Sequence, residues 1–302
     1  MKKTALGALG LMAAGAGASF ILWSEYERDC LAVEGISIVS EKVRAPKRLV
    51  FLSDLHNKEF GPENARLIKA IDQAEPDAVL IGGDMMVSKG RPGVSVAVSL
   101  IEKLAEKYPV YYGNGNHENR MVWERSVYGS LYEQYRDRLE ELGVIYLENN
   151  TSLIGEDVAV SGADLKKKHY RKLFFQKPRP LEKDYLYNCL GKADEKRFQI
   201  LLIHSPMYFK ESAAWGADLT LSGHFHGGTI RLPLLGGVMT PQYQFFLPWC
   251  AGSFEDGGKR MVVSRGLGTH SINIRINNKP QVILLDLKPA VHRAGKTGRK
   301  PL

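Results

Sequence analysis

The clearest chemical signal in the sequence is a pair of histidines, His224 and His226, separated by one residue and flanked by glycines. The run over 218–221 just before them has the length of a short strand. Two imidazoles at this spacing can bind neighbouring metal ions if the backbone turns sharply after the strand. Two loop histidines without a role would look the same, so the pair alone is a weak signal.

Four earlier segments, 51–56, 81–84, 113–118 and 201–206, end apolar runs in the same way, each with a side chain that can bind metal. Together the five segments supply carboxylates, an amide oxygen and neutral imidazoles, which suit divalent ions such as Mn²⁺, Fe²⁺ or Zn²⁺. They contain no thiolate, which disfavours a structural zinc site. The candidate metal ligands are Asp54, His56, Asp84, Asn116, His204, His224 and His226.

Asp84 is the residue best placed to be shared by two ions. It follows the middle one of three early strands, and Gly82 and Gly83 remove side chains that would crowd two ions there. Two adjacent ions can clamp an attacking hydroxide and the leaving oxygen of a phosphate ester in line. If Asp84 bridges two ions, these residue types permit attack on a phosphate ester.

His117 directly follows Asn116, so we expect its side chain to point towards the substrate and not to repeat the ligand's role. A histidine in that place can protonate a leaving alkoxide near neutral pH, which makes His117 the candidate catalytic acid. Glu118 could orient it, although a solvent-exposed glutamate is an equally simple interpretation.

The elements that must position these residues alternate between strand and helix in the first half of the chain. Short apolar runs predict strands, and apolar residues at helical spacing over 64–74 and 95–108 predict helices between them. Such alternation implies parallel strands with helical crossovers, and sites in such sheets lie beyond the carboxyl ends of the strands. Later runs predict strands over 144–147, 158–161, 199–203, 217–221, 229–235, 260–264, 272–276 and 281–287.

Composition adds little about the site. The chain has 302 residues, 44% of them hydrophobic and 25% charged, as expected for a globular protein of one large or two small domains. Its net charge of +8 favours anionic partners, but much of the excess lies in a basic segment over 165–197 and in the tail. That segment is either a solvated surface excursion or a cap that gathers anions.

The first residues predict a membrane segment. Two lysines precede an uncharged stretch over 4–23, which has about the length that crosses a bilayer as a helix, and acidic residues follow it. We therefore expect a single-pass anchor with a cytoplasmic amino terminus and the catalytic domain outside the cell. A cleaved signal peptide and an exported protein are the alternative, because small-residue cleavage sites occur within the stretch.

The expected organisation has four parts. Residues 1–23 form the signal-anchor or signal peptide, 24–47 a lead-in segment, 48–287 the catalytic domain and 288–302 a basic, disordered tail. The aromatic loop over 243–249 could pack into the core. Alternatively, it could contact acyl chains or a nucleobase of a ligand.

Taken together, the five segments resemble the calcineurin-like metallophosphoesterase family, whose pattern is DxH, GD, GNH(E/D), a single His and then GHxH. The segments over 226–233 and 264–269 look like its YkuE/YaeI-like, membrane-associated bacterial subgroup. The resemblance implies an α/β fold, a four-layer αββα sandwich of two mixed sheets flanked by helices, here with an N-terminal hydrophobic helix. It also implies one metal bound by Asp54, His56, Asp84 and His226, a second bound by Asp84, Asn116, His204 and His224, and His117 as the acid.

The implied function is a dinuclear hydrolase in which a bridging hydroxide attacks a phosphodiester, phosphomonoester or pyrophosphate bond. A lipid-linked pyrophosphate of the UDP-diacylglucosamine type is the alternative substrate, since the predicted anchor and the aromatic loop favour a membrane-resident molecule. A non-catalytic metal-binding surface protein is the alternative from another class. The basic residues form no recognisable motif for sequence-specific nucleic-acid binding, so no specific nucleic-acid partner is expected.

Overall fold

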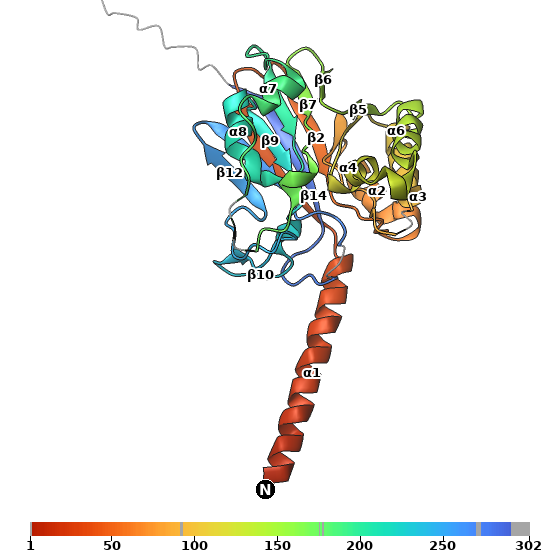
Figure 1. Cartoon of the computed structure of the whole chain (residues 1–302), viewed down its shortest axis with the longest axis vertical. Helices are drawn as coiled ribbons and strands as arrows, with labels where there is room; N and C mark the ends of the chain where they lie inside the picture. The colour runs from red at the N-terminus through yellow and green to blue at the C-terminus, as the bar shows by residue number, and fades with distance from the viewer. Residues whose placement is uncertain (1, 91–92, 175, 177, 270–272, 291–302) are drawn as a thin grey trace, which may run out of the picture.

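Two six-stranded sheets stack face to face, and helices cover the outer face of each (Figure 1). The computed structural model describes residues 2–290 with gaps at 91–92, 175, 177 and 270–272, and in the first helix it describes side chains from residue 15 onward. The layer order is helix, sheet, sheet, helix. This confirms the predicted four-layer αββα sandwich.

The first sheet carries the strands of the first half of the chain, with two late additions at one edge. In sheet order they are β1 (Ala32–Ser40), β14 (Gln281–Pro289), β2 (Lys47–Leu52), β3 (Ala78–Ile81), β4 (Val110–Gly113) and β5 (Ile145–Leu147). Strands β2 to β5 run parallel, while β14 is antiparallel to β2, so the sheet is mixed. All residues of β3 and β4 are buried, as expected for strands covered on both faces.

The helices of this half form the crossovers between its parallel strands. They are α2 (Ala65–Asp72), α3 (Ser95–Ala105), α4 (Asn116–Trp123), α5 (Arg125–Tyr128) and α6 (Leu131–Glu141), with the short helix η1 (Pro62–Asn64) before α2. In α2, Leu67 and Ile71 lie one turn apart and are buried. In α6, Tyr132, Tyr135 and Leu139 form the buried stripe. Helices α2 and α6 therefore pack one apolar face on the sheet.

The second sheet is built from later strands. In sheet order they are β12 (Gly252–Asp256), β13 (Lys259–Val263), β9 (Leu219–Ser222), β8 (Phe198–Leu202), β7 (Val158–Gly162) and β6 (Asn150–Ile154). Its outer face is covered by α7 (Tyr185–Leu190) and α8 (Phe209–Trp215), which share a buried apolar cluster with it. The remaining elements are η2 (Lys167–Tyr170), η3 (Pro206–Tyr208), η4 (His226–Gly228) and a small hairpin of β10 (Arg231–Leu232) and β11 (Gly236–Gly237).

The core between the sheets joins apolar side chains from both inner faces. Phe51 and Leu80 come from the first sheet, and Val160 and Leu221 come from the second. All four are fully buried. This shared core holds the two sheets in register, so the ends of β2, β3, β4, β8 and β9 lie close to one another.

Three predicted elements in the last third of the chain differ from the structure. The strand expected over 229–235 contains only β10, Arg231–Leu232, followed by the turn of the small hairpin. The strand expected over 272–276 is absent from its described part, 273–276, where Ile276 makes only an isolated bridge to Ile230. The tail expected from residue 288 begins later, because Lys288 and Pro289 still pair with Val39 and Ser40 of β1. Residues 291–302 lie outside the described part of the chain.

The amino-terminal helix α1 (Lys2–Asp29) projects from the body of the molecule (Figure 1). No helix in the described part of the chain is both long enough and apolar enough to cross a membrane. The prediction of a single-pass anchor over 4–23, with its cytoplasmic amino terminus and external domain, is therefore wrong. The physical reason is composition: the stretch is rich in Ala and Gly, which present little apolar surface to lipid.

Candidate metal centre

The predicted site residues lie just after five strands, on loops or, for Asn116, His117 and His226, at the start of the short helices α4 and η4. Segments after β2, β3 and β4 supply the ligands of the first half, and segments after β8 and β9 supply the histidines of the second half. All these strands point their carboxyl ends to the same edge of the sandwich, where sites in parallel sheets form. The residues brought together there are Asp54, His56, Asp84, Asn116, His117, His204, His224 and His226.

One set of donors, the Asp54 group, consists of Asp54, His56 and His226. Asp54 Oδ1 lies 3.7 Å from His56 Nε2 and 3.5 Å from His226 Nε2. The two Nε2 atoms are 3.2 Å apart. Donor atoms of all three residues lie within 4.8 Å of one another, close enough to share one cation.

A second set, the His204 group, consists of Asp84, Asn116, His204 and His224. Asp84 Oδ2 lies 3.1 Å from His204 Nε2. The side-chain oxygen of Asn116 faces His224 Nδ1 at 2.8 Å and Asp84 Oδ2 at 3.2 Å. An amide nitrogen in that place would donate to both atoms, whereas an amide oxygen there is suited to a cation among the three.

Asp84 lies between the two groups. Its Oδ2 is 3.1 Å from His204 Nε2 on one side and 3.9 Å from His56 Nε2 on the other. The positions of these atoms fit the prediction that one carboxylate serves two ions.

The other ring nitrogens distinguish the histidines. His204 Nδ1 lies 2.7 Å from Gly82 O, and His226 Nδ1 lies 3.3 Å from Gly268 O, so each donates N–H to a carbonyl and directs the lone pair of Nε2 into the site. His117 is the reverse case, because its Nδ1 accepts from Ser88 N at 2.8 Å. Neutral His117 therefore carries its proton on Nε2, which lies 4.0 Å from Asp84 Oδ2. That tautomer directs an N–H, and not a lone pair, from Nε2, so His117 is less suited than the other histidines to bind a cation.

The chemistry of the donors fits divalent cations. Asp54 and Asp84 are fully buried, and buried carboxylates are costly unless a cation pairs with them. Burial raises the pKa of Asp54, but His226 and His204 outweigh burial and lower that pKa overall. Burial and the charge of Asp54 leave the pKa of Asp84 raised. Burial lowers the pKa of His204, yet Asp84 and Asp54 raise it to about 10, so these carboxylates attract positive charge strongly.

The backbone at the site is strained. Asp54, His56, Asp84, His224 and His226 all have positive φ, between 48° and 65°. Such angles cost about 1–3 kcal/mol each in residues other than glycine and persist only where the surroundings impose them. Space is equally restricted, since a Cβ at Gly83 would collide with the backbone of Gly115. The sequence pattern thus reflects both ligand chemistry and the tight turns that aim the ligands.

Glu118 has a different role from the one considered in the sequence. It is fully buried, and its carboxylate accepts from the backbone N–H groups of Asp84, Met85 and Gly115 at 2.9 to 3.0 Å. Burial, together with the charge of Asp84, raises the pKa of Glu118 to about 7. It joins the loop after β3 to the start of α4, while Ser88, which the sequence did not single out, is a hydrogen-bond partner of His117.

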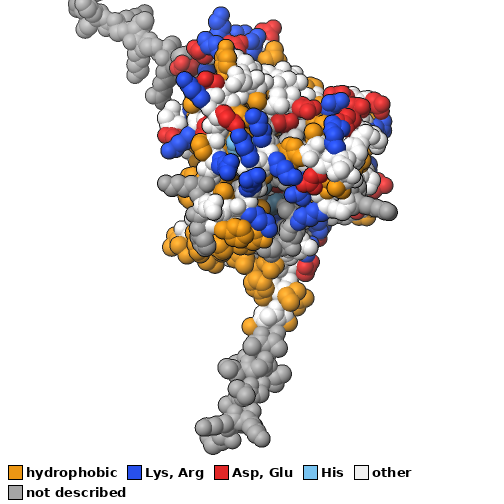
Figure 2. All heavy atoms as spheres, viewed as in Figure 1, with side chains coloured by type: hydrophobic (Ala, Val, Ile, Leu, Met, Phe, Trp, Pro, Cys, Tyr) orange, Lys and Arg blue, Asp and Glu red, His pale blue; other side chains and the backbone are white. Residues whose placement is uncertain are grey.

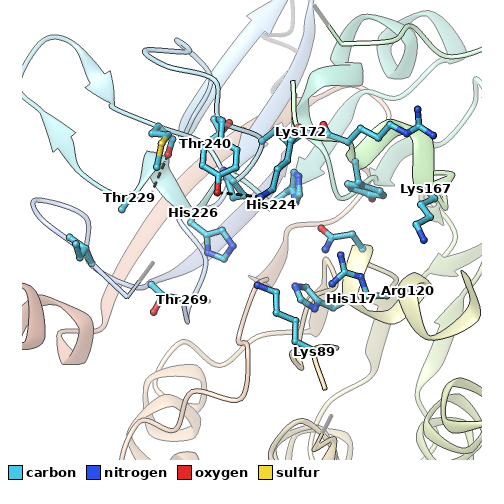
Figure 3. A pocket seen from close by; sticks show the side chains of 18 of the residues that line it. Lys89, His117, Arg120, Lys167, Lys172, His224, His226, Thr229, Thr240 and Thr269 are labelled. Carbon is cyan, nitrogen blue, oxygen red and sulfur yellow. Dashed lines mark hydrogen bonds between the residues drawn. The ribbon is translucent and has the colours of Figure 1, made fainter. Parts of the chain in front are cut away.

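A cavity of about 440 Å³ opens above the two groups (Figure 3). Its walls include His117, His224 and His226, and no Asp or Glu is among the described residues that line it. Lys and Arg side chains gather over the middle of this face of the molecule (Figure 2). The basic residues that line the cavity are Lys89, Arg120, Lys167, Arg171, Lys172 and Arg275.

The segment 165–197 contributes directly to this cavity. Lys167, Tyr170, Arg171 and Lys172 are among its lining residues, as expected of a cap that gathers anions. The Tyr170 ring packs edge-on against His224 with centroids 5.1 Å apart. Sequence reasoning assigned no role to Tyr170, because a tyrosine in a basic loop carries no local signal.

The remaining histidines lie away from the two groups or outside the described residues. His169 is buried, and its Nδ1 lies 3.0 Å from the hydroxyl of Tyr208. His270 and His292 lie outside the described part of the chain.

Comparisons with known proteins agree with the geometry. A model of the family described as calcineurin-like phosphoesterase matches residues 47–228, which include all five segments. The uncharacterized metallophosphoesterase YkuE of Bacillus subtilis (strain 168) is 27% identical over 249 residues, covering 80% of this chain and 79% of its own. Phosphodiesterase YaeI of Escherichia coli (strain K12) is 26% identical over 250 residues, covering 80% and 83%. An uncharacterized metallophosphoesterase of Aquifex aeolicus (strain VF5) is 26% identical over 278 residues, covering 88% and 95%.

Proposed function

The chain belongs to the calcineurin-like phosphoesterase family, and from that premise we propose that it hydrolyses phosphate-ester or pyrophosphate bonds with two divalent cations. The observation that carries the proposal is the position of Asp84, whose Oδ2 lies within 3.9 Å of both His56 and His204. One cation would be held by Asp54, His56, Asp84 and His226, and the other by Asp84, Asn116, His204 and His224. When bound, such a pair supplies Lewis acidity and an activated water. Mn²⁺, Fe²⁺ and Zn²⁺ all suit these donors.

His117 would donate the proton to the leaving oxygen. Ser88 N–H fixes its Nδ1 as an acceptor, so the proton is held on Nε2. His117 also lines the cavity, on the side where a substrate would enter. General acids of this kind contribute about 10²- to 10⁴-fold to a rate.

The cavity favours a substrate with more negative charge than one phosphate. Lys89 and Lys172 lie on opposite sides of it (Figure 3), and Arg120 and Lys167 lie close together, since they approach Glu124 Oε1 to 3.9 and 3.0 Å. Trp123 and Tyr170 also line the cavity, and their rings lie 5.9 Å apart, which offers an apolar contact beside the cations. A diester or pyrophosphate that carries an organic group fits this lining better than a small monoester.

A lipid-linked pyrophosphate is the alternative substrate, and one observation favours it. Tyr243 lines the cavity, and the loop that follows it exposes Phe245, Phe246 and Trp249, each with 38% or more of its surface accessible. These side chains could contact an acyl chain while the pyrophosphate lies over the metal groups. If a lipid-linked pyrophosphate is the substrate, kcat/KM should be higher for a detergent-solubilised lipid pyrophosphate than for a soluble nucleotide.

Asp84→Asn tests the proposed function. The variant keeps an oxygen to accept from His117 N, which donates to Asp84 Oδ1 at 2.7 Å, so we expect it to fold. We expect kcat/KM on aryl phosphate, diester and pyrophosphate substrates to fall on the order of 10²- to 10³-fold, with loss of bound metal. Asp286→Asn, which removes a surface partner of Arg48, serves as the matched control and should retain activity. A metal-loaded wild-type chain that cleaves none of these substrates would instead favour the non-catalytic metal-binding protein.

A further inference from the structure

Arg275 is a buried cation whose side chain contacts the backbone of the loop beside the site. It is 1% exposed and donates to the carbonyls of Arg265, Gly266 and Gly268 at 2.7 to 3.1 Å. Burial lowers the pKa of Arg275 to about 9, against the opposing charge of Asp54. A buried guanidinium that satisfies several carbonyls at once fixes the path of that loop.

The loop it fixes touches two members of the Asp54 group. Gly268 O, which accepts from Arg275 at 2.7 Å, also faces His226 Nδ1 at 3.3 Å. Gly268 N donates to Asp54 O at 2.6 Å. A Cβ added at Gly266 would lie 2.8 Å from Asp54 Cβ, so the loop lies directly against that residue. The position of Gly268 therefore sets the orientation of the His226 ring.

Asn278 holds the backbone of the same histidine. It is fully buried, and its Nδ2 donates to His226 O at 2.7 Å and to Thr229 O at 3.1 Å. His226 has a φ of 48°, a conformation that other contacts must maintain. Asn278 supplies such a contact.

The last turns of α1 support both Arg275 and Asn278. Ser24 Oγ accepts from Arg275 N at 3.0 Å, and Glu27 Oε2 accepts from Asn278 N at 2.8 Å. Ser24 and Glu27 are only 3% and 2% exposed, although much of the helix around them is exposed. These two side chains reach a segment 251 residues away in the chain.

We propose that Ser24 and Glu27 are positioning residues for the Asp54 group, acting through Arg275 and Asn278 on His226. The inference rests on the proposed metal sites, and it assigns to the end of α1 a part in binding one metal ion and not the other. Groups that orient a ligand from behind typically change metal affinity by about 10- to 100-fold. The ion pair between Asp29 of α1 and Arg66 does not explain why α1 packs against the domain. Both side chains are about half exposed, and such exposed pairs contribute little to stability.

The experiment compares metal binding by four full-length chains: the wild type, Ser24→Ala/Glu27→Ala, Glu27→Gln and Glu25→Ala. Glu25→Ala is the matched control, since Glu25 lies on the same helix, pairs only locally with Arg28 and is 59% exposed at its side chain. Glu27→Gln keeps an oxygen that accepts from Asn278 N. Mn²⁺ binding is measured by titration calorimetry and by elemental analysis after dialysis.

We expect the double variant to lose affinity for one of two Mn²⁺ ions by about 10- to 100-fold, while the control and Glu27→Gln bind both as the wild type does. Unchanged binding of both ions, or equal weakening of both, would overturn the proposal. Hydrogen exchange of the metal-free chains provides a test independent of metal. The amides of Leu267 and Gly268, which donate to Ser53 O and Asp54 O, should exchange faster in the double variant alone. Equal protection in all four chains would contradict the linkage even if the chain bound no metal.

Discussion

The Asp54 group and the His204 group are supported by different parts of the molecule. In the His204 group, Gly82 O fixes His204, and Glu118 binds the backbone amides of Asp84 and Gly115. Gly82 directly follows β3, and Glu118 lies in the first turn of α4, shortly after β4. In the Asp54 group, His226 depends on Gly268 and Asn278, which follow it by 42 and 52 residues.

The difference shows that the two groups depend on different parts of the chain. The residues that support the His204 group lie next to the strands that carry it, whereas those that support His226 lie in the last third of the chain. The His204 group is held by segments that directly follow strands of the two sheets, including the first turn of α4. The Asp54 group also needs residues 265–268 and 275–278 and, through Arg275 and Asn278, the end of α1. We therefore expect substitutions behind the His204 group to affect folding and both metals, and those behind the Asp54 group to affect one metal with little unfolding.

Among variants that test the difference between the two groups, Glu118→Ala is expected to have the largest effect on stability and metal content. The change leaves three buried backbone N–H groups and the Tyr112 hydroxyl, 2.6 Å from Glu118 Oε1, without their acceptor. Each unsatisfied buried donor costs about 1–3 kcal/mol, so the free energy of unfolding should fall by at least about 3 kcal/mol. Urea unfolding and the metal content per chain measure the outcome.

Glu118→Gln is the matched control for that experiment, because an amide keeps one acceptor oxygen. It should lose about 1–2 kcal/mol, less than the alanine variant. If Glu118→Ala unfolded at the wild-type urea concentration, or lost one metal ion while keeping the other, the two groups would not differ in the way described.

His117→Asn is expected to have the next largest effect, and it tests the contrast between histidine tautomers. Because His117 would hold a proton on Nε2, the variant should lower kcat by about 10²-fold while both metal ions stay bound. Ser88→Ala is the control, since it removes a hydroxyl 3.0 Å from His117 Nδ1 but keeps the backbone N–H that donates to it. Loss of a metal ion from His117→Asn would show that His117 is a ligand.

The smallest expected effect is on the pH dependence of stability, and it concerns Asp164, which lies near the segment that carries Asn116. Asn114, on the loop that carries Asn116, donates to Asp164 Oδ2 at 3.2 Å. Burial raises the pKa of Asp164 to about 7, well above its usual value of about 3.9. The folded state thus favours the protonated acid, and the stability it contributes is present at low pH and lost as pH rises from about 4 through about 7.

Asp164→Asn removes this titration, so its Tm should exceed that of the wild type increasingly between pH 5 and pH 8. Thermal unfolding of metal-free protein at several pH values measures this. Asp72→Asn is the contrasting control: a hydrogen bond from Lys107 lowers the pKa of Asp72, so its contribution to stability changes only below about pH 4 and its Tm difference should stay constant between pH 5 and pH 8. A Tm difference for Asp164→Asn that does not change with pH would show that Asp164 stays ionised in the folded chain.

Much of the centre could be predicted from sequence because each site residue directly follows a strand. Apolar runs before Asp54, Asp84 and His204 identify the strands, and parallel strands bring their carboxyl ends to one edge. The five segments resembled the family, and that resemblance implied the αββα sandwich. The prediction of a membrane anchor was wrong. It relied on the length of the uncharged stretch and gave too little weight to its Ala- and Gly-rich composition.

What only the tertiary structure decided is how the ligands are held. Ser88 determines the proton position on His117, Glu118 joins two loops, and Arg275 lies in a segment that by composition predicted a strand. Ser24 and Glu27 meet their partners 251 residues later in the chain. Local periodicity reports which face of an element is apolar, but it carries no information about which distant backbone group a buried polar side chain will satisfy, because that partner is chosen by the packing of the whole chain.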